Sequence, residues 1–158
     1  MPRIHKTSTT SAFDSMSVLA RSMGENNDCA VKAIALACNV PYATAHATLA
    51  QLGRKKGRGT YRTLSYKAVG LLGYNVTMWT TAERRRLIES YPKAHRILRH
   101  ITTHHPRRFK KVWSGMADRT FMLFCATHVA VVKGGELHDW TVNKAMRVVD
   151  IWEITPKA

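Results

Sequence analysis

Residues 25–40 read ENNDCAVKAIALACNV, in which Cys29 stands between a polar triplet and a run of small apolar residues. Asp28 is a good helix N-cap, and the apolar run after it carries Lys32 as its only charged side chain. A helix that is apolar nearly all round is usually buried at the centre of a domain. The stretch therefore predicts a buried central helix with Cys29 in its first turn.

Further helices are indicated on the C-terminal side of this stretch. Their patterns are separated by Pro, Gly and basic connections, with one strand-like segment among them. Gly53 can end the first of these helices, and Thr80 with Glu83 matches a capping box at the start of a later one. We predict helices over residues 41–52, 64–72, 82–91 and 94–101, and a strand over residues 74–79.

The character of the chain changes after residue 119. Four short segments there are rich in β-branched and aromatic residues and are separated by turn signals. Gly134-Gly135 between two of them is a strong hairpin signal. Helices first and an antiparallel sheet last predict an α+β fold. We expect a single domain over residues 24–158, preceded by a flexible Ser/Thr-rich arm over residues 1–23.

The composition argues against several classes of protein. Of 158 residues 45% are hydrophobic, which is ordinary for a globular domain. Cys29, Cys38 and Cys125 lie at wide spacings without a CxxC pair, so neither a disulfide framework nor a cysteine-rich zinc site is expected. No apolar run reaches the roughly 20 residues of a membrane span, and the first residues lack the apolar core of a secretory signal. We expect a cytoplasmic protein without membrane contact.

The net charge of +15 is concentrated in the middle of the chain. Residues 51–111 contain 16 Lys and Arg against two acidic residues, whereas the rest of the chain holds 9 basic and 8 acidic residues. The resulting positive potential favours a polyanionic partner: DNA or RNA, an acidic protein surface or an acidic peptide substrate. The alternative is a solvated surface without a partner. The candidate polyanion-binding residues are Arg54, Lys55, Lys56, Arg58, Arg84, Arg85, Arg86, Arg107, Arg108, Lys110 and Lys111.

The predicted position of Cys29 suits a nucleophile. A thiol at a helix N-terminus is in a field that stabilises the thiolate, and the thiolate is the reactive form. Backbone N–H groups of the same turn are placed to hold a developing oxyanion. The alternative is that Cys29 is a small buried hydrophobe, as free cysteines often are.

The hairpin geometry selects one histidine as the base. If Gly134-Gly135 form a two-residue loop, facing residues have numbers that sum to 269. Asp139 is then the diagonal neighbour of His128 on the same face, roughly 7–8 Å away between backbones, which lets its carboxylate reach the imidazole. His138 falls on the opposite face. A three-residue loop would reverse this parity, so the prediction depends on the turn.

A cysteine at a helix start, a later histidine and an acidic residue on the next strand give nucleophile, base and orienting group. The segments NDCAVKAIALA (27–37), GTYRTLSYKAVGLLGYNV (59–76) and THVAVVKGGELHDW (127–140) together resemble the papain-like cysteine peptidases. The closest likeness is to the compact branch that trims double-glycine leaders from bacteriocins, and to small phage-encoded relatives. The resemblance implies a papain-like fold, with Cys29 as nucleophile, His128 as general base and Asp139 as the residue that orients the imidazole.

The sequence departs from the family at the oxyanion site. Papain-like enzymes usually place a glutamine about six residues before the cysteine, and that position here is Met23. Asn26 or Asn27 is a candidate substitute, because either amide can donate a hydrogen bond. No cofactor and no metal site is predicted, although His100 and His104 have a helical metal-ligand spacing.

Three functions from different classes follow from these patterns. The first is a cysteine peptidase that cleaves a peptide or isopeptide bond. The second is an inactive papain-like protein with a structural role, such as a virion-associated phage protein. The third is a basic nucleic-acid-binding protein whose cysteine is only structural. The oligomeric state is not indicated by the sequence.

Overall fold

The computed structural model describes residues 10–91, 101–102, 110–139 and 146–158. Helices α1 (Ser11–Ser22), α2 (Cys29–Ala37), α3 (Tyr42–Gln51) and α4 (Arg62–Leu71) come first. Strand β1 (Tyr74–Met78) and helix α5 (Thr81–Glu89) follow, with short elements β2 (Ile101–Thr102) and α7 (Lys110–Ser114) after them. The C-terminal part contains β3 (Thr120–Phe124), β4 (Val129–Lys133), β5 (Glu136–His138), β6 (Arg147–Val148) and β7 (Asp150–Pro156).

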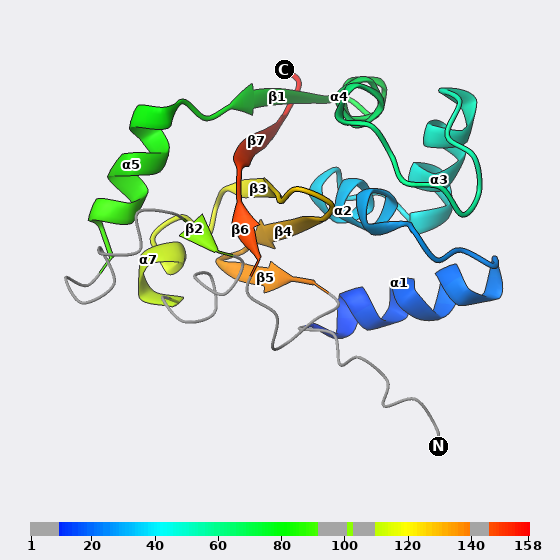
Figure 1. Cartoon of the computed structure of the whole chain (residues 1–158), viewed down its shortest axis with the longest axis horizontal. Helices are drawn as coiled ribbons and strands as arrows, with labels where there is room; N and C mark the ends of the chain where they lie inside the picture. Colours follow the sequence, from blue (N-terminus) through cyan, green and yellow to red (C-terminus); the bar gives the residue numbers. More distant parts are fainter. Residues whose placement is uncertain (1–9, 92–100, 103–109, 140–145) are drawn as a thin grey trace.

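The fold is α+β, with N-terminal helices packed against an open antiparallel sheet (Figure 1). The five strands lie in the order β1-β7-β3-β4-β5, and every neighbouring pair is antiparallel. Strands β2 and β6 form a separate two-stranded sheet. Helix α2 packs along β4 near the middle of the molecule, so the predicted central helix and fold class are both confirmed.

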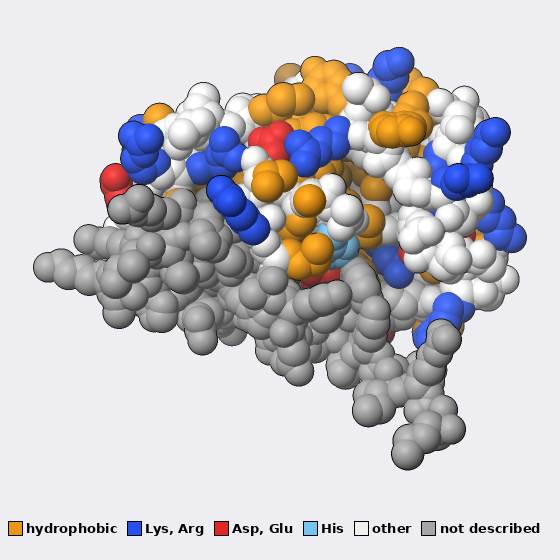
Figure 2. All heavy atoms as spheres, in the orientation of Figure 1, with side chains coloured by type: hydrophobic (Ala, Val, Ile, Leu, Met, Phe, Trp, Pro, Cys, Tyr) orange, Lys and Arg blue, Asp and Glu red, His pale blue; other side chains and the backbone are white. Residues whose placement is uncertain are grey.

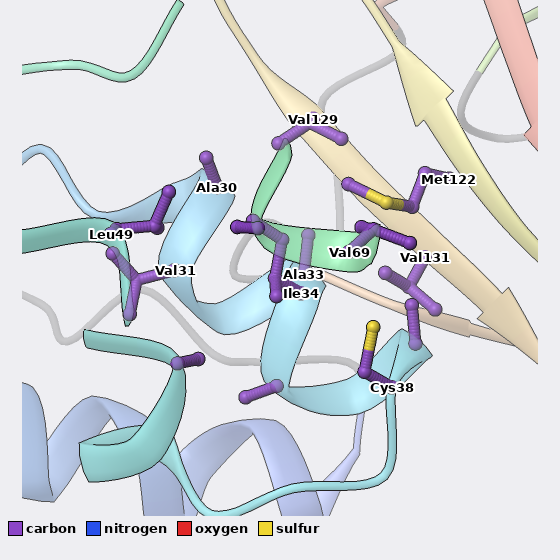
Figure 3. Packing of buried hydrophobic residues seen from close by; sticks show 14 of the residues in the cluster. Ala30, Val31, Ala33, Ile34, Cys38, Leu49, Val69, Met122, Val129 and Val131 are labelled. Carbon is purple, nitrogen blue, oxygen red and sulfur yellow. The ribbon is translucent and has the colours of Figure 1, made fainter. Parts of the chain in front are cut away.

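The sheet is buried on both faces, which explains why β3 and β4 are almost uniformly apolar. On one face, Met122, Val129 and Val131 point toward α2 and α4, where Ile34 and Val69 meet them (Figure 3). On the other face, Phe121 packs edge-on against Trp113 and Trp79. The hydrophobic core therefore has two halves separated by the sheet.

Helix boundaries follow local sequence signals. Thr80 and Glu83 form the predicted capping box, each side chain bonding the other residue's backbone N–H. Gly53 ends α3 with a φ of +105°, a backbone conformation that favours glycine. Helix α4 begins at Arg62 rather than at the predicted residue 64, with Tyr61 in the N-cap position. The helix predicted over residues 94–101 lies outside the described residues, apart from Ile101 in β2.

Residues 11–22 differ from the flexible arm predicted for residues 1–23, because they form α1. Phe13 and Ala20 are buried, and Met16 and Met23 pack partly against the core. These four residues recur at a helical spacing, which gives α1 an apolar face despite its Ser-rich composition. Lys32 of α2 also lies over the Phe13 ring, 5.1 Å from its centroid.

No helix in the described ranges is long and apolar enough to cross a membrane.

The packing of α2 predicts a large stability cost for truncating Ile34, which is fully buried between the helix and the sheet. Ile34→Ala should lower the free energy of unfolding by about 2–5 kcal/mol through lost burial and a residual cavity. The matched control is Val18→Ala on α1, where the valine is 60% exposed; a change within about 0.5 kcal/mol is expected there. Urea denaturation measures both. Equal losses in the two variants would contradict the placement of α2 in the core.

Candidate active site

Cys29 is the first residue of α2 and is partly exposed. Asp28 occupies the N-cap position, but its side chain makes no capping hydrogen bond, contrary to the prediction. Instead, its carboxylate accepts a hydrogen bond from the Tyr42 hydroxyl at 2.8 Å and pairs with Lys32 at 3.4 Å. The first-turn N–H groups of α2 are therefore not occupied by Asp28, and the backbone N–H of Ala30 contributes to lowering the pKa of the Cys29 thiol.

His128 lies at the start of β4, in the tight turn that leads from β3. The N–H of Cys125 donates to the His128 carbonyl at 2.7 Å, which closes that turn and fixes the histidine backbone. Because α2 packs along β4, the Cys29 thiol comes within hydrogen-bond reach of the His128 ring. The structure thus brings together two residues that are 99 positions apart in the sequence.

Asp139 lies just after β5 and completes the constellation. Its Oδ1 accepts a hydrogen bond from His128 Nε2 at 2.8 Å, and only 8% of the histidine and 3% of the aspartate are exposed. Because Nε2 is bound to Asp139, Nδ1 is the ring nitrogen left to face Cys29. Strands β4 and β5 pair with residue numbers that sum to 269, which confirms the predicted register. His138 points elsewhere, with its Nδ1 2.8 Å from the Thr10 hydroxyl.

The contacts of His128 shift the pKa values of the Cys29 thiol and of the His128 imidazole in the directions that favour the charged forms of both groups. Burial raises the pKa of the Cys29 thiol, but the hydrogen bond and charge of His128 outweigh it, and the net pKa is lowered. Burial lowers the pKa of His128, but the hydrogen bond and charge of Asp139 and the contact and charge of Cys29 together outweigh burial and raise the pKa to about 9. A lowered thiol pKa beside a raised imidazole pKa shifts the pair toward thiolate and imidazolium.

A cleft of about 870 Å³ opens beside Cys29 and His128. The cleft is lined by residues from the start of α2, the β3–β4 turn, the loop from Gly53 to Tyr61 and the first turn of α4. Figure 2 shows the described surface hollowed between its centre and the side formed by α3 and α4. A nucleophile at the wall of an open cleft is accessible to a substrate.

Asn26 and Asn27, which were predicted as oxyanion donors, lie shortly before Cys29 in the sequence. Neither is among the described residues that line the cleft. Asn27 donates its amide to the Gly57 carbonyl at 3.0 Å, so this amide holds the loop after α3. Asn26 is exposed, and its Oδ1 lies close to Gly57. Met23, at the usual glutamine position, is the C-cap of α1 and packs partly against the core.

Arg54 is a correction to the predicted polyanion-binding set, because it is 7% exposed and its guanidinium is bound inside the protein. Its Nη1 donates to Glu25 Oε2 at 2.5 Å, and its Nη2 donates to the Asn27 carbonyl at 3.2 Å. Glu25 also accepts from Gly57 N–H at 2.6 Å and lies 3.0 Å from His46 Nε2. Arg54 therefore anchors the loop after α3 to the segment before Cys29.

The other predicted basic residues occupy several places. Lys55, Lys56 and Arg58 are exposed on the loop after α3. Arg85 and Arg86 are exposed on α5, and Arg84 donates to the Val149 carbonyl. Figure 2 shows Lys and Arg side chains over α5 on one side and over the α3 and α4 side on the other. Arg107 and Arg108 lie outside the described residues. Lys110 and Lys111 belong to α7, but their side chains are not described.

Glu25 and its partners are the site residues that sequence reasoning missed. Glu25 is a buried carboxylate three positions before Asp28, and a lone acid in a polar segment carries no signal for burial. Burial raises its pKa, but the hydrogen bonds from Arg54 and Gly57, the charge of Arg54 and the contact with His46 together outweigh burial and lower the pKa. No group of three or more His, Cys, Asp or Glu side chains in the described ranges is placed to hold a metal ion. His100 and His104 lie outside those ranges.

No protein-family model, curated protein or solved structure matches this chain.

The lowered pKa of Cys29 predicts selective alkylation. At a pH below the ordinary thiol pKa, Cys29 should react with iodoacetamide faster than an unperturbed cysteine, because a larger fraction of it is thiolate. Cys38 and Cys125 should stay unmodified in folded protein, because burial raises their pKa to about 12 and about 11. His128→Ala should slow the reaction of Cys29, and His138→Ala is the matched control. Peptide mapping by mass spectrometry follows each thiol, and equal labelling of all three would contradict the site geometry.

Proposed function

We propose that this chain is a papain-like cysteine peptidase that hydrolyses a peptide or isopeptide bond with Cys29, His128 and Asp139. One observation carries the proposal: at an open cleft His128 hydrogen-bonds the Asp139 carboxylate and lies close enough to the Cys29 thiol to lower its pKa. This series of sulfur, imidazole and carboxylate is the arrangement that thiol hydrolases need for nucleophile, base and orienting group. The arrangement of N-terminal helices against an antiparallel sheet supports the resemblance to the family.

In the first half of the reaction, the Cys29 thiolate attacks the carbonyl carbon of the substrate and forms a carbon–sulfur bond. The proton on His128 Nδ1 passes to the leaving nitrogen, the carbon–nitrogen bond breaks, and an acyl-thioester remains on Cys29. The raised pKa of His128 keeps the imidazole protonated until the leaving group needs the proton.

In the second half, neutral His128 takes a proton from a water molecule that attacks the thioester carbonyl. The carbon–sulfur bond breaks, the acid product leaves, and the thiolate and imidazolium are restored. Asp139 holds the ring through Nε2, so that Nδ1 stays directed at the reacting atoms in both halves.

The oxyanion of each tetrahedral intermediate is assigned to backbone donors. Helix α2 has no side-chain cap and no acidic residue in its first turn, so its N-terminal N–H groups and dipole favour negative charge there. Met23 contributes no donor, and the Asn27 amide is engaged with Gly57. Losing one such donor typically costs about 10²–10³ in rate, so we expect a slower enzyme than relatives with the glutamine.

The second candidate is a papain-like protein without turnover, such as a structural, virion-associated or nucleic-acid-binding protein. The exposed basic residues Lys56, Arg85 and Arg86 favour contact with a polyanion in the cytoplasm of a cell or in a virion. This candidate requires no reaction at Cys29, so the two functions are separated by measuring turnover.

Replacing Cys29 should abolish turnover without unfolding the protein. Cys29→Ala should fold normally, because the side chain is partly exposed, and release no product from a fluorogenic peptide library. Asp139→Asn should lower kcat by two or more orders of magnitude, because the imidazole loses its orienting partner. Glu136→Gln, which removes an exposed carboxylate from the same strand, should keep wild-type kcat. Unchanged turnover in Cys29→Ala would reject the mechanism.

The pH dependence of kcat/KM should follow the two shifted groups. The rate rises with pH as the Cys29 thiol ionises, and it falls as pH increases through about 9, where His128 loses the proton needed by the leaving amine. Asp139→Asn should move the falling limb to lower pH, because the hydrogen bond to Asp139 raises the pKa of His128. Glu136→Gln should leave that limb in place. A profile that keeps rising above pH 9 would contradict the assigned role of His128.

A further inference from the structure

The part of the cleft wall formed by the loop after α3 and the start of α4 is basic. Lys55, Arg58 and Arg62 line it, together with the buried Arg54, and no acidic side chain lines the cleft in the described part of the chain. Lys55 and Arg58 are exposed, so their charges reach the space where a substrate would lie. A low-dielectric wall with charges of one sign concentrates ligands of the opposite charge.

The loop that carries two of these cations is fixed to the protein. Glu25 accepts hydrogen bonds from Arg54 Nη1 at 2.5 Å and from Gly57 N–H at 2.6 Å, on either side of Lys55. Asn27 also binds the Gly57 carbonyl at 3.0 Å. The cations at Lys55 and Arg58 are thus presented by an anchored loop, which lowers the entropy cost of binding between them.

Two hydroxyl groups at the same wall lack a partner. Ser65 is 1% exposed, and neither its Oγ nor the buried Oγ1 of Thr60 makes a hydrogen bond within the described part of the chain. Both residues line the cleft: Thr60 precedes the N-cap of α4, and Ser65 lies near the helix start, which has no side-chain cap and no acidic residue. Buried polar groups usually have a partner, so a ligand with acceptor oxygens would satisfy them.

The nearby acidic groups do not neutralise this wall. Glu25 pairs with Arg54, and Asp150 lies 3.5 Å from Arg62, so these two cations are compensated, whereas no ion pair compensates Lys55 or Arg58 in the described part of the chain. We propose that the wall formed by Lys55, Arg58, Thr60 and Ser65 is a subsite for a carboxylate of the substrate, so that the enzyme selects acidic peptides. This inference rests on the proposed peptidase function. The carboxylate belongs either to an Asp or Glu side chain or to a peptide C-terminus.

Binding of peptides to full-length Cys29→Ala tests the subsite without turnover. The probes are a short C-terminally amidated peptide with two Glu residues, its Gln counterpart, and the Gln peptide with a free C-terminus, each carrying a neutral fluorophore. Fluorescence anisotropy should show about tenfold tighter binding of at least one carboxylate probe than of the amidated Gln peptide. Preference for the Glu peptide assigns a side-chain carboxylate, and preference for the free C-terminus assigns a terminal one.

Substitutions inside and outside the cleft test where the carboxylate peptides bind. Lys55→Gln with Arg58→Gln should weaken carboxylate binding about tenfold, whereas Lys67→Gln with Arg85→Gln removes the same charge outside the cleft and should have little effect. Ser65→Ala should also weaken binding, yet leave the melting temperature unchanged or higher, because the lost hydroxyl has no partner in the fold. A merely structural serine would show the opposite pattern.

Three outcomes would overturn the subsite: equal affinity for all peptides, equal losses in both double variants, or preference for single-stranded DNA of the same charge over the carboxylate peptides. The last result would assign the wall to a nucleic acid.

Failure of the peptidase proposal can be distinguished from failure of the subsite proposal. Tight carboxylate binding to Cys29→Ala without any turnover by the wild-type protein rejects the peptidase but keeps the subsite. Equally fast hydrolysis of all three peptides, including the one with a free C-terminus, keeps the peptidase but rejects the subsite.

Discussion

The close packing of α2 along β4 is the constraint on which the site depends. The face of α2 toward the core consists largely of alanines, with Ile34 as its large member, so the helix axis can approach the sheet closely. The two elements are tied at both ends. At one end Cys29 meets His128, and at the other Lys133 Nζ donates to the Leu36 carbonyl at 3.0 Å. The close approach of helix and strand therefore brings two residues that are distant in the sequence to the same site.

The charged form of that pair is stable only because each member has a partner. A buried imidazolium or thiolate alone would be too costly, and each would revert to its neutral form. His128 has Asp139 on one side and Cys29 on the other, and the backbone N–H groups of Ala30 and Val129 also support the sulfur. Cys125 lines the same cleft but has no such support, and burial with the charge of Asp139 raises its pKa to about 11. Environment, not residue type, distinguishes the two thiols.

The parts of the structure that the sequence predicted are those with local causes. The Gly134-Gly135 turn fixed the β4–β5 register and hence the face shared by His128 and Asp139. The capping box at Thr80 and the apolar run after Cys29 are likewise local patterns. The contacts that could not be predicted are those between residues far apart in the sequence. Arg54 looked like its basic neighbours because its acceptor, Glu25, lies 29 residues earlier. The Asp28 carboxylate was assigned to a cap because nothing in the sequence indicates its contact with Tyr42.

The basic middle of the chain divides by burial into cations that build the fold and cations that face solvent. Arg54 belongs to the first group: its ion pair with Glu25 is buried, and removal of either partner would leave an uncompensated charge inside the protein. Lys55 and Arg58 belong to the second, although they lie on the same short loop. The buried pair sets where this loop runs, and the loop in turn sets where the exposed charges lie. The positive wall beside Cys29 is therefore a consequence of a single buried carboxylate three residues before the N-cap of α2.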